Sequence, residues 1–559
     1  NPPVSDVKVS FIHGVASGDP LDDRVILWTR VTPEQESEGA IHVLCEVAED
    51  PEFNSIVLAD VFTTSGERDY TVKFDAAGLL SEQHYWYRFS VGEQYSPVGR
   101  AQTLPTPGQY AERLRYAVCS CSSYPHGYFS VYRMIANRSD LDFVLHLGDY
   151  IYEYGDGQYG DNAQRLLDPP HEILVLEDYR RRYAHYRKDP ALQAVHQTHP
   201  FITVWDDHES ANDSYKDGAE NHSEGEGEWL ARKAQAIQAY FEWMPIRNVA
   251  DKERIYRRFE FGNLVSLYML DTRVLARDEQ LNYSDFDLTS PAGQSAFAAA
   301  IGATDRALLG SEQLTWLSDA ITTSSTQWQV LGQQVLMTKM HLPVEVMLLL
   351  ASLQSAQANG GDPSELLAQA NVLFAELAQI KGRVLAGDPS VTEAELARVQ
   401  TTIPYNLDAW DGYAYEREVL LGTAIAAQKN LVVLAGDTHN GWAGQLKTDA
   451  SNPIAASQNA GVEFATASVS SPGLEEYLAL NTQDAQTVAQ IEQVIALLVD
   501  DLAYNNLVER GYLTVTFTPA KASAKWNYIS TIKAREYQVV ESRTKELSML
   551  AGQAQLQNA

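Results

Sequence analysis

Four short polar clusters in the sequence contain side chains that commonly bind metal ions. Each cluster directly follows an apolar run. They are Cys119-Ser120-Cys121, Gly148-Asp149-Tyr150-Ile151-Tyr152, Trp205-Asp206-Asp207-His208-Glu209 and Gly436-Asp437-Thr438-His439-Asn440. Each is weak alone, because Gly-Asp after a strand is common and Asp-His pairs occur in many surface turns. Four such clusters in one chain are much harder to produce by chance, so together they predict a metal site.

The apolar runs before these clusters are predicted to be strands of an α/β sheet. Residues 115–120 and 142–147 are short and apolar, and a helix-like segment at 128–136 lies between them. Further strands are expected at 202–205, 264–270, 328–335 and 431–435. Ligands of α/β sheets bind beyond the carboxyl ends of the strands. Several of these strands end in a polar cluster, which places the clusters where a ligand would bind.

The first 106 residues have a different pattern. Short β-branched and aromatic runs at 25–31, 41–47, 56–64, 70–74 and 85–91 are separated by Gly, Asp and Pro, which predicts a β-sandwich. The stretch 103–108 is rich in Thr and Pro and indicates a linker. We therefore expect an N-terminal domain over 1–106 and a second domain over 107–559, which carries the four polar clusters.

Two segments of the second domain are predicted to be helical insertions. Residues near 340–400 are rich in Ala, Leu, Glu and Gln, and residues 477–505 place Ile491, Val494, Ile495 and Leu498 at helical spacing. We favour packing or lid helices without chemistry of their own. Whether they form a lid stays open.

The composition limits the possible partners. Of the 559 residues, 42 are Lys or Arg and 74 are Asp or Glu, giving a formal net charge of −32. Such a surface repels extended nucleic acid and anionic membranes. If the protein acts on phosphates, bound cations must reverse the field locally. Three cysteines are too few for a disulfide scaffold, and no apolar run is long enough to span a membrane.

The order of the clusters resembles the motif series of two-metal phosphoesterases. That series is an early metal-binding strand end, Gly-Asp, Gly-Asn-His-Glu/Asp and a late Gly-His-x-His, and purple acid phosphatases extend Gly-Asp to Gly-Asp-x-x-Tyr, the form of 148–152. Here Cys121 stands where aspartate is usual, Asp207 replaces the asparagine and Asp437 the first histidine. These departures are similar to those of the PhoD-type alkaline phosphatases. Segments 11–20, 27–30, 123–128, 270–273, 408–413 and 470–473 also look like that family, which leaves the two helical insertions outside the resemblance.

The resemblance implies a fold and a ligand set. The fold is an α/β (α+β) four-layer αββα metallophosphoesterase sandwich, preceded by a small all-β domain of immunoglobulin or fibronectin type. The implied metal ligands are Cys121, Asp149, Tyr152, Asp207, Asp437 and His439. Strand phase alone permits Cys119 or Cys121, and the match of 122–127 to the family favours Cys121.

The chemistry of these donors predicts two different metals. Asp149 has two oxygens and can bridge two cations. Thiolate, imidazole and phenolate suit a transition metal, and phenolate favours Fe³⁺. The carboxylates Asp207 and Asp437 suit Ca²⁺. We expect Fe³⁺ and Ca²⁺, with the number of Ca²⁺ ions open.

The resemblance also implies hydrolysis of phosphate esters by a two-metal-activated water or hydroxide. Asp149 and His208 are the expected catalytic residues, and His208 would hydrogen-bond to the leaving group or protonate it. Glu209 would orient His208. Contact with the substrate or with the ligands is expected from Asp206, Glu209, Asn440 and Gln334, although a turn or a buried hydrogen bond explains Asn440 and Gln334 equally well.

Several alternatives stay open at this stage. The enzyme could prefer monoesters or diesters, and a phospholipase D-like phosphodiesterase is the alternative function. A third interpretation is a calcium-binding protein that kept the fold and lost catalysis, although every cluster retains its donors. Small phosphate esters are the expected partners, and the oligomeric state is open. Because calcium is plentiful outside cells and the family is exported, we expect a periplasmic or extracellular protein whose leader has been removed.

Overall fold

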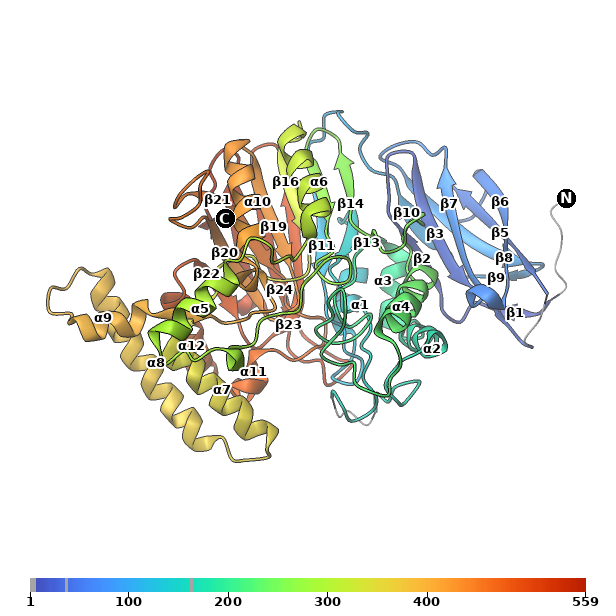
Figure 1. Ribbon diagram of the computed structural model, residues 1–559. Helices are drawn as coiled ribbons and strands as arrows, with labels where there is room; N and C mark the ends of the chain where they lie inside the picture. The colour runs from blue at the N-terminus through green and yellow to red at the C-terminus, as the bar shows by residue number, and fades with distance from the viewer. Residues whose placement is uncertain (1–6, 36–38, 161–163, 559) are drawn as a thin grey trace.

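Two large β-sheets lie face to face in the centre of the molecule, with helices on their outer sides (Figure 1). The computed structural model describes residues 7–35, 39–160 and 164–558. Within this part of the chain, the sheets and helices form the expected mixed α/β fold with four layers, preceded in sequence by an all-β region.

The first sheet has ten strands and contains three of the strands that precede polar clusters. At its centre lie β11 (Leu114–Cys119), β12 (Phe143–His146) and β13 (Pro200–Thr203), which run parallel. The strands β23 (Arg510–Phe517), β24 (Lys521–Ile529), β25 (Lys545–Leu550) and β26 (Gln557–Asn558) extend it on the β11 side. Every residue of β12 and β13 is buried, as expected for strands covered on both faces.

The second sheet has seven strands in the order β14-β15-β16-β19-β21-β20-β22. Its parallel centre consists of β15 (Val265–Met269), β16 (Trp328–Gly332), β19 (Asn430–Ala435) and β21 (Asn459–Ala465). The outer strands are β14 (Arg257–Phe261), β20 (Gly441–Lys447) and β22 (Leu502–Asn506). Side chains such as Val118 and Val144 of the first sheet share one buried cluster with Val432 and Phe464 of the second, so the main core lies between the sheets.

Helices cover the outer faces. On the side of the first sheet lie α1 (Ser130–Ala136), α2 (Leu176–Tyr186), α3 (Pro190–Thr198) and α4 (Trp229–Trp243) (Figure 1). On the side of the second sheet, α6 (Gly310–Thr323) and α10 (Ala414–Ala426) form a second buried cluster with Leu331 and Val433. α5 (Pro291–Ile301) lies in the connection before α6.

A group of helices projects from the second half of the molecule (Figure 1). It contains α7 (Val344–Ala358), α8 (Ser364–Leu385), α9 (Glu393–Gln400) and α12 (Ala485–Leu498). In the second predicted insertion, 477–505, helix is found at α12, whereas α11 (Leu474–Tyr477) ends at its first residue. The last residues of this insertion belong to β22 at the sheet edge. No helix of the described ranges has the length and apolar character that crossing a bilayer requires.

The N-terminal region is joined to the first large sheet by backbone hydrogen bonds. β2 (Val15–Gly18), β3 (Arg24–Arg30) and β7 (Thr71–Ala77) continue the ten-stranded sheet, and β2 pairs in parallel with β13. A five-stranded sheet with β5 (Ile41–Ala48), β6 (Ile56–Thr64), β8 (His84–Val91), β9 (Gln94–Tyr95) and β10 (Gly99–Gln102) packs against these strands through a separate apolar core. The N-terminal strands are therefore built into the sheet that carries β11, β12 and β13.

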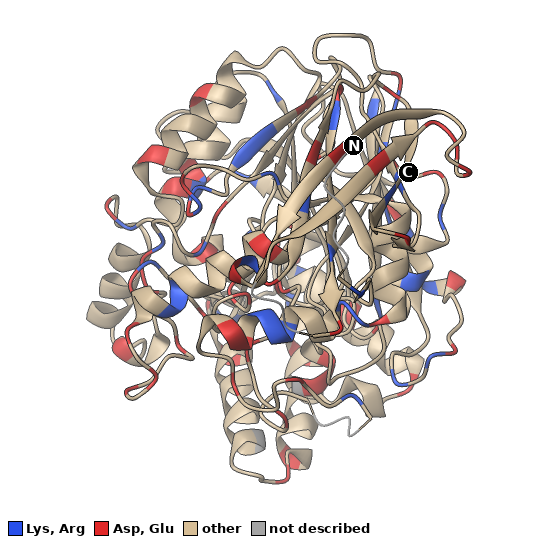
Figure 2. Ribbon diagram, turned by 90° about the vertical axis from the view of Figure 1, so that its right-hand side faces the viewer, with Lys and Arg blue, Asp and Glu red and all other residues tan. Residues whose placement is uncertain are grey.

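The surplus of acidic residues is distributed widely. Figure 2 shows Asp and Glu on strands, helices and loops alike, with Lys and Arg interspersed. The net charge of −32 is therefore a property of the molecule as a whole.

Candidate metal centre

The four polar clusters of the sequence meet at the carboxyl ends of the central strands. Cys121 follows β11, Asp149 follows β12, Asp207 follows β13 and Asp437 follows β19. Because the two sheets face each other, strand ends of both contribute to one site. Three groups of side chains there bring ligand atoms within 4.8 Å of one another, and Asp149 and Asp207 each belong to two of these groups.

The first part of the site, called here the mixed-donor half, consists of Cys121, Asp149, Tyr152 and His439. The Asp149 carboxylate oxygen Oδ2 lies 3.4 Å from Cys121 Sγ and 3.3 Å from the Tyr152 hydroxyl. The same hydroxyl lies 3.5 Å from His439 Nε2. A sulfur, a phenol oxygen, an imidazole nitrogen and a carboxylate thus converge, which is a donor set for a transition metal.

Burial keeps most of these donors uncharged. Burial, reinforced by Asp149, raises the pKa of the Cys121 thiol and of the Tyr152 phenol well above their usual values. Burial lowers the pKa of His439 to about 3. His439 donates its Nδ1–H to the carbonyl of Pro472, which leaves Nε2 as the lone-pair nitrogen facing the site.

The backbone is strained at four of the predicted ligands. Cys121, Asp149, Asp437 and His439 have φ angles of 60°, 53°, 63° and 68°, in the left-handed region that glycine prefers. Each such residue costs about 1 kcal/mol or more. Such a concentration of strained residues is typical of functional sites, where the required positions of a few side chains outweigh the energetic cost of backbone strain.

The second part, called here the carboxylate half, consists of Asp206, Asp207 and Asp437. One carboxylate oxygen from each of them lies within 4.8 Å of the others. Asp206 Oδ2 and Asp207 Oδ1 are buried without a hydrogen-bond partner. Buried anionic oxygens without partners are costly, and a cation would satisfy them. An all-oxygen donor set suits a hard cation such as Ca²⁺.

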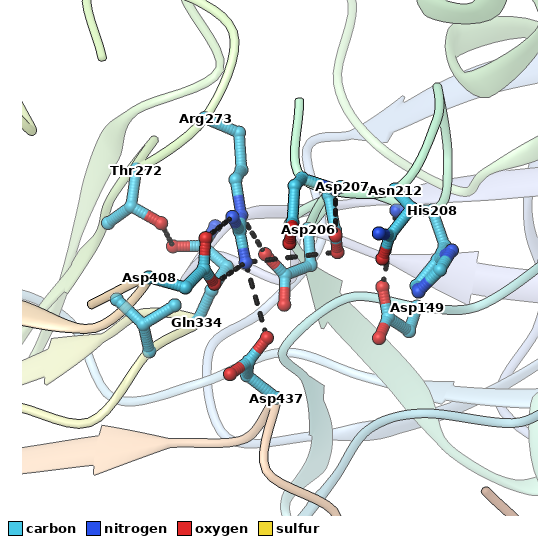
Figure 3. A network of polar contacts seen from close by, with 12 residues as sticks. Asp149, Asp206, Asp207, His208, Asn212, Thr272, Arg273, Gln334, Asp408 and Asp437 are labelled. Atoms are coloured by element: carbon cyan, nitrogen blue, oxygen red, sulfur yellow. Dashed lines mark hydrogen bonds and ion pairs between the residues drawn. The ribbon is translucent and has the colours of Figure 1, made fainter. Parts of the chain in front are cut away.

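Arg273 lies in the middle of these carboxylates (Figure 3). It follows β15, donates from Nε to Asp206 at 2.5 Å, and approaches Asp437 from Nη2 at 3.2 Å. Nη1 and Nη2 bind the two oxygens of Asp408 at 2.6 and 2.7 Å, and Arg277 also binds Asp408 at 2.5 Å. Neither arginine belongs to the site residues that the sequence predicted.

Arg273 and the neighbouring carboxylates shift the pKa values of the carboxyl groups in opposite directions. Burial raises the pKa of Asp206 to about 7, even though Arg273 opposes the shift. Burial and then Asp206 raise the pKa of Asp437 well above its usual value. Burial acts on Asp207 as well, but Arg273 and His208 together hold its pKa below the usual range. The carboxylate half therefore holds more negative charge than its arginine fully compensates.

His208 is held by a different carboxylate from the one that we expected. Its Nδ1 lies 2.6 Å from Glu153 Oε2, and Glu153 also accepts the backbone N–H of Asn212 at 2.6 Å. Glu209 instead accepts the backbone N–H groups of Asp149, Tyr150 and Asp206 at 3.1, 2.8 and 2.9 Å. The expectation that Glu209 orients His208 is thus corrected, because its oxygens tie together the two loops that carry Asp149 and Asp206. Burial opposes the proton on His208, but Glu153, Asp207 and Asp149 raise its pKa well above the usual value.

The other predicted residues lie behind the ligands. Gln334 donates to the carbonyls of Trp205 and Leu270 at 2.6 and 2.9 Å and accepts from Thr272 at 2.7 Å, so buried hydrogen bonds account for it. Asn440 accepts from the Leu474 amide at 3.0 Å, while its Nδ2 is buried without a partner. Cys119 belongs to the apolar core between the sheets, whereas Cys121 faces Asp149.

Three further residues at the site were missed as site residues by the sequence analysis. Ser471 contacts the Tyr152 hydroxyl at 2.6 Å, Glu153 holds His208, and Asp408 faces Arg273. The signals were present but indirect. Ser471 and Asp408 lie in segments noted only for their familial look, and Glu153 directly follows the Gly-Asp-x-x-Tyr motif.

The donors therefore fit a pair of adjacent cations. The mixed-donor half offers sulfur, nitrogen and oxygen, the carboxylate half offers oxygen alone, and Asp149 faces both. Its Oδ2 points toward Cys121 and Tyr152, while Oδ1 lies 3.4 Å from the backbone nitrogen of His208. Two adjacent cations can clamp a phosphoryl group and activate water.

Known proteins with similar sequences and structures point in the same direction. Residues 116–526 match the family described as PhoD-like phosphatase, and residues 3–105 match the family described as PhoD-like phosphatase, N-terminal domain. The chain is similar to alkaline phosphatase D of Bacillus subtilis (strain 168), with 32% identity over 528 residues, covering 92% of this chain and 77% of that protein. A solved structure described as "Structure of PhoD" superposes with a TM-score of 0.77 at 30% identity, covering 100% of this chain and 93% of that one.

Proposed function

Since the chain belongs to the PhoD-like phosphatase family and is a metal-dependent phosphoric ester hydrolase, we propose that it uses two unlike cations. A transition metal, Fe³⁺, would occupy the mixed-donor half, and Ca²⁺ would occupy the carboxylate half. The observation that carries this proposal is the segregation of donors on either side of Asp149: sulfur, phenol and imidazole on one side, carboxylates on the other.

Each residue has a proposed place in this arrangement. Cys121, Tyr152 and His439 would hold the first cation, Asp207 and Asp437 the second, and Asp149 both. When bound, such cations would polarise phosphoryl oxygens and lower the pKa of a bound water molecule. Glu209 would keep the Asp149 and Asp206 loops in register, because it accepts backbone N–H groups from both.

His208 is the proposed hydrogen-bond donor to the leaving oxygen of the ester. Its Nδ1 is engaged by Glu153 at 2.6 Å, so Nε2 is the nitrogen left to face the substrate. The ring also packs against Tyr152, with centroids 4.3 Å apart, which places it beside the mixed-donor half. Both contacts restrict the ring orientation, as a group that meets a leaving oxygen requires.

The family similarity favours neither the phospholipase D-like alternative nor the non-catalytic calcium-binding alternative. Small phosphate esters are the proposed substrates, because the net charge of −32 would repel extended nucleic acid.

The experiment that tests the function is p-nitrophenol release at alkaline pH from p-nitrophenyl phosphate and from bis(p-nitrophenyl) phosphate. Asp149→Asn should abolish turnover of both esters. A matched control is Asp60→Asn, an exposed residue of β6, which should retain wild-type turnover. Turnover that survives Asp149→Asn would contradict the proposed bridging role, and the better wild-type substrate would decide between monoesterase and diesterase.

We also propose that the protein works outside the cytoplasm, in the periplasm or the extracellular medium. The support is the proposed calcium half, because free calcium is far more abundant there. Phosphatase activity in fractionated source cells, compared with a cytoplasmic marker enzyme, would test this. Activity that stays with the cytoplasmic marker would contradict it.

A further inference from the structure

Arg273 is fully buried and surrounded by carboxylates. Its side chain is 0% exposed, and it contacts Asp206, Asp408 and Asp437 directly, with Asp207 Oδ1 3.8 Å away. Four carboxylates around one guanidinium is an unusual ratio, because buried ion pairs usually come closer to balance. Figure 3 shows the guanidinium lying between Asp408 on one side and the Asp206 and Asp437 carboxyl groups on the other.

Every nitrogen of this guanidinium already has an acceptor. Nε binds Asp206, Nη1 binds Asp408, and Nη2 binds Asp408 and approaches Asp437. These bonds use four of the five N–H donors of the guanidinium and leave a single N–H on Nη1. To grip a phosphoryl group with two parallel bonds, Arg273 would have to break at least one buried charge-assisted bond, and such bonds are about twice as strong as neutral ones. The geometry therefore disfavours Arg273 as a substrate-binding residue.

The negative charges around Arg273 outnumber the positive ones. When all four are ionised, as ligands of a cation would be, Asp206, Asp207, Asp408 and Asp437 supply four negative charges, and Arg273 and Arg277 supply two positive ones. The difference is two negative charges, which one divalent cation would balance. Arg277 touches Asp408 and not the other three acids, so Arg273 is the arginine that acts on the carboxylate half.

We propose that Arg273 is a positioning residue that serves as a built-in counter-cation of the carboxylate half. It fixes Asp206 and Asp437, keeps their repulsion tolerable when no cation is bound, and thereby weakens the attraction of this half for added cations. The proposal rests on the proposed calcium site. Arg273 would stabilise the carboxylate half before calcium binds, at the expense of calcium affinity.

The test is calcium binding to three variants. Titration calorimetry with CaCl₂, after removal of calcium with EGTA, compares the wild type with Arg273→Gln, Arg273→Lys and Arg277→Gln. Removing a positive charge beside the site should tighten calcium binding, so Kd should fall about tenfold or more in Arg273→Gln. Arg273→Lys keeps the charge and should bind calcium like the wild type. Arg277→Gln removes an equal charge from Asp408 alone and should change Kd by less than about threefold.

The direction of the change separates the possible roles. Weaker calcium binding by Arg273→Gln would overturn the proposal, because it would mean that Arg273 chiefly orients the ligands. Equal tightening in Arg277→Gln would also overturn it, since the effect would then be one of general charge. Failure of the wild type to bind calcium at all would overturn the calcium site itself, and this role with it.

A second measurement covers the case in which Arg273→Gln unfolds without calcium. The variant would be purified in CaCl₂, and calcium release would be followed after mixing with excess chelator. Release slower than from the wild type supports the counter-cation role, and faster release contradicts it. Thermal melting should show the calcium-free variant below the wild type, with added CaCl₂ closing most of that gap.

Discussion

The two halves of the candidate metal centre differ in how they hold buried ionisable groups. In the mixed-donor half, burial holds the Cys121 thiol and the Tyr152 phenol protonated and the His439 imidazole neutral. In the carboxylate half a guanidinium offsets part of the negative charge of the acids, with Arg273 in contact with Asp206 and Asp437. The mixed-donor half thus keeps its side chains uncharged, whereas the carboxylate half offsets part of its negative charge with an arginine.

This difference predicts how each half would take up its cation. A metal entering the mixed-donor half must displace protons from its ligands, because thiolate and phenolate are the forms that bind. A cation entering the carboxylate half finds oxygens that are already partly arranged by an arginine. The first half should therefore hold its metal tightly once loaded, and the second should exchange its cation more readily.

The largest expected effect comes from substituting a ligand of the mixed-donor half. Cys121→Ser exchanges a soft ligand for a hard one, and loss of several kcal/mol of metal-dependent stabilisation should lower kcat/KM roughly 10³-fold. The measurements are p-nitrophenyl phosphate turnover and bound transition metal per chain. Cys119→Ser is the matched control, because Cys119 packs in the apolar core and its loss should cost about 1 kcal/mol of stability with little change in activity. Similar activity losses in both variants would remove the distinction between the two cysteines.

The second-largest effect is expected when calcium is removed selectively from the carboxylate half. EGTA should lower activity about 100-fold, and CaCl₂ should restore it better than MgCl₂, because Mg²⁺ demands a tighter octahedral site. Elemental analysis should show that the transition metal stays with the protein. Simultaneous loss of both metals would contradict the expected difference in exchange between the halves.

A smaller effect tests the carboxylate that holds His208. Glu153→Gln weakens the 2.6 Å contact to His208 and should lower kcat about 10- to 100-fold. The loss should be larger for alkyl phosphates than for p-nitrophenyl phosphate, since a poor leaving group needs more help. Glu172→Gln, which removes a carboxylate paired with Arg232, is the control and should retain most activity. A loss that is equal for all esters would point to a structural role for Glu153.

The smallest effect concerns a neutral base beneath the mixed-donor half. His146 accepts the Gly148 N–H at 3.3 Å and contacts the Tyr132 hydroxyl at 2.8 Å, and burial lowers its pKa to about 3. An unfolded histidine titrates near 6.5, so between these values the unfolded state binds the extra proton and stability falls as the pH falls. From pH 6.5 to pH 5 this group should cost about 1.5 kcal/mol. His146→Gln should reduce the pH dependence of the free energy of unfolding, measured by urea denaturation at each pH, by that amount. An unchanged pH dependence would contradict the assignment.

The sequence alone predicted the strand ends that carry the site. An apolar run followed by a polar cluster is a local signal, and it placed Cys121, Asp149 and Asp207 at the ends of β11, β12 and β13. The all-β N-terminal region and the mixed α/β fold also followed from local patterns. The assignment of these side chains as metal ligands remains a prediction that the proposed experiments test.

What the sequence could not supply are the long-range partners. Arg273 and Asp408 are 135 positions apart, and nothing local marks them as a pair. The resemblance to two-metal phosphoesterases assigned Glu209 to His208, whereas the folded strand ends bring Glu153 closer to it. The helices α2 and α4 were also missed, because buried arginines such as Arg182 and Arg232 obscure their apolar faces. Pairing of β2 with β13 could not be read from either strand, because the partners are far apart in the chain.

The pairing of β2 with β13 leaves β2 without one of its neighbours during part of protein synthesis. β2 ends at Gly18, but its neighbour β13 begins at Pro200, so the N-terminal strand has no partner on that side until some 180 residues more have been synthesised. At ribosomal rates of about 5–20 residues per second, the wait is about 10–40 s. The edge of β2 is open to other strands during that time. A nascent chain therefore depends on rapid arrival of the segment that carries Asp206 and Asp207, and the same hydrogen bonds that complete the first sheet close this period of exposure.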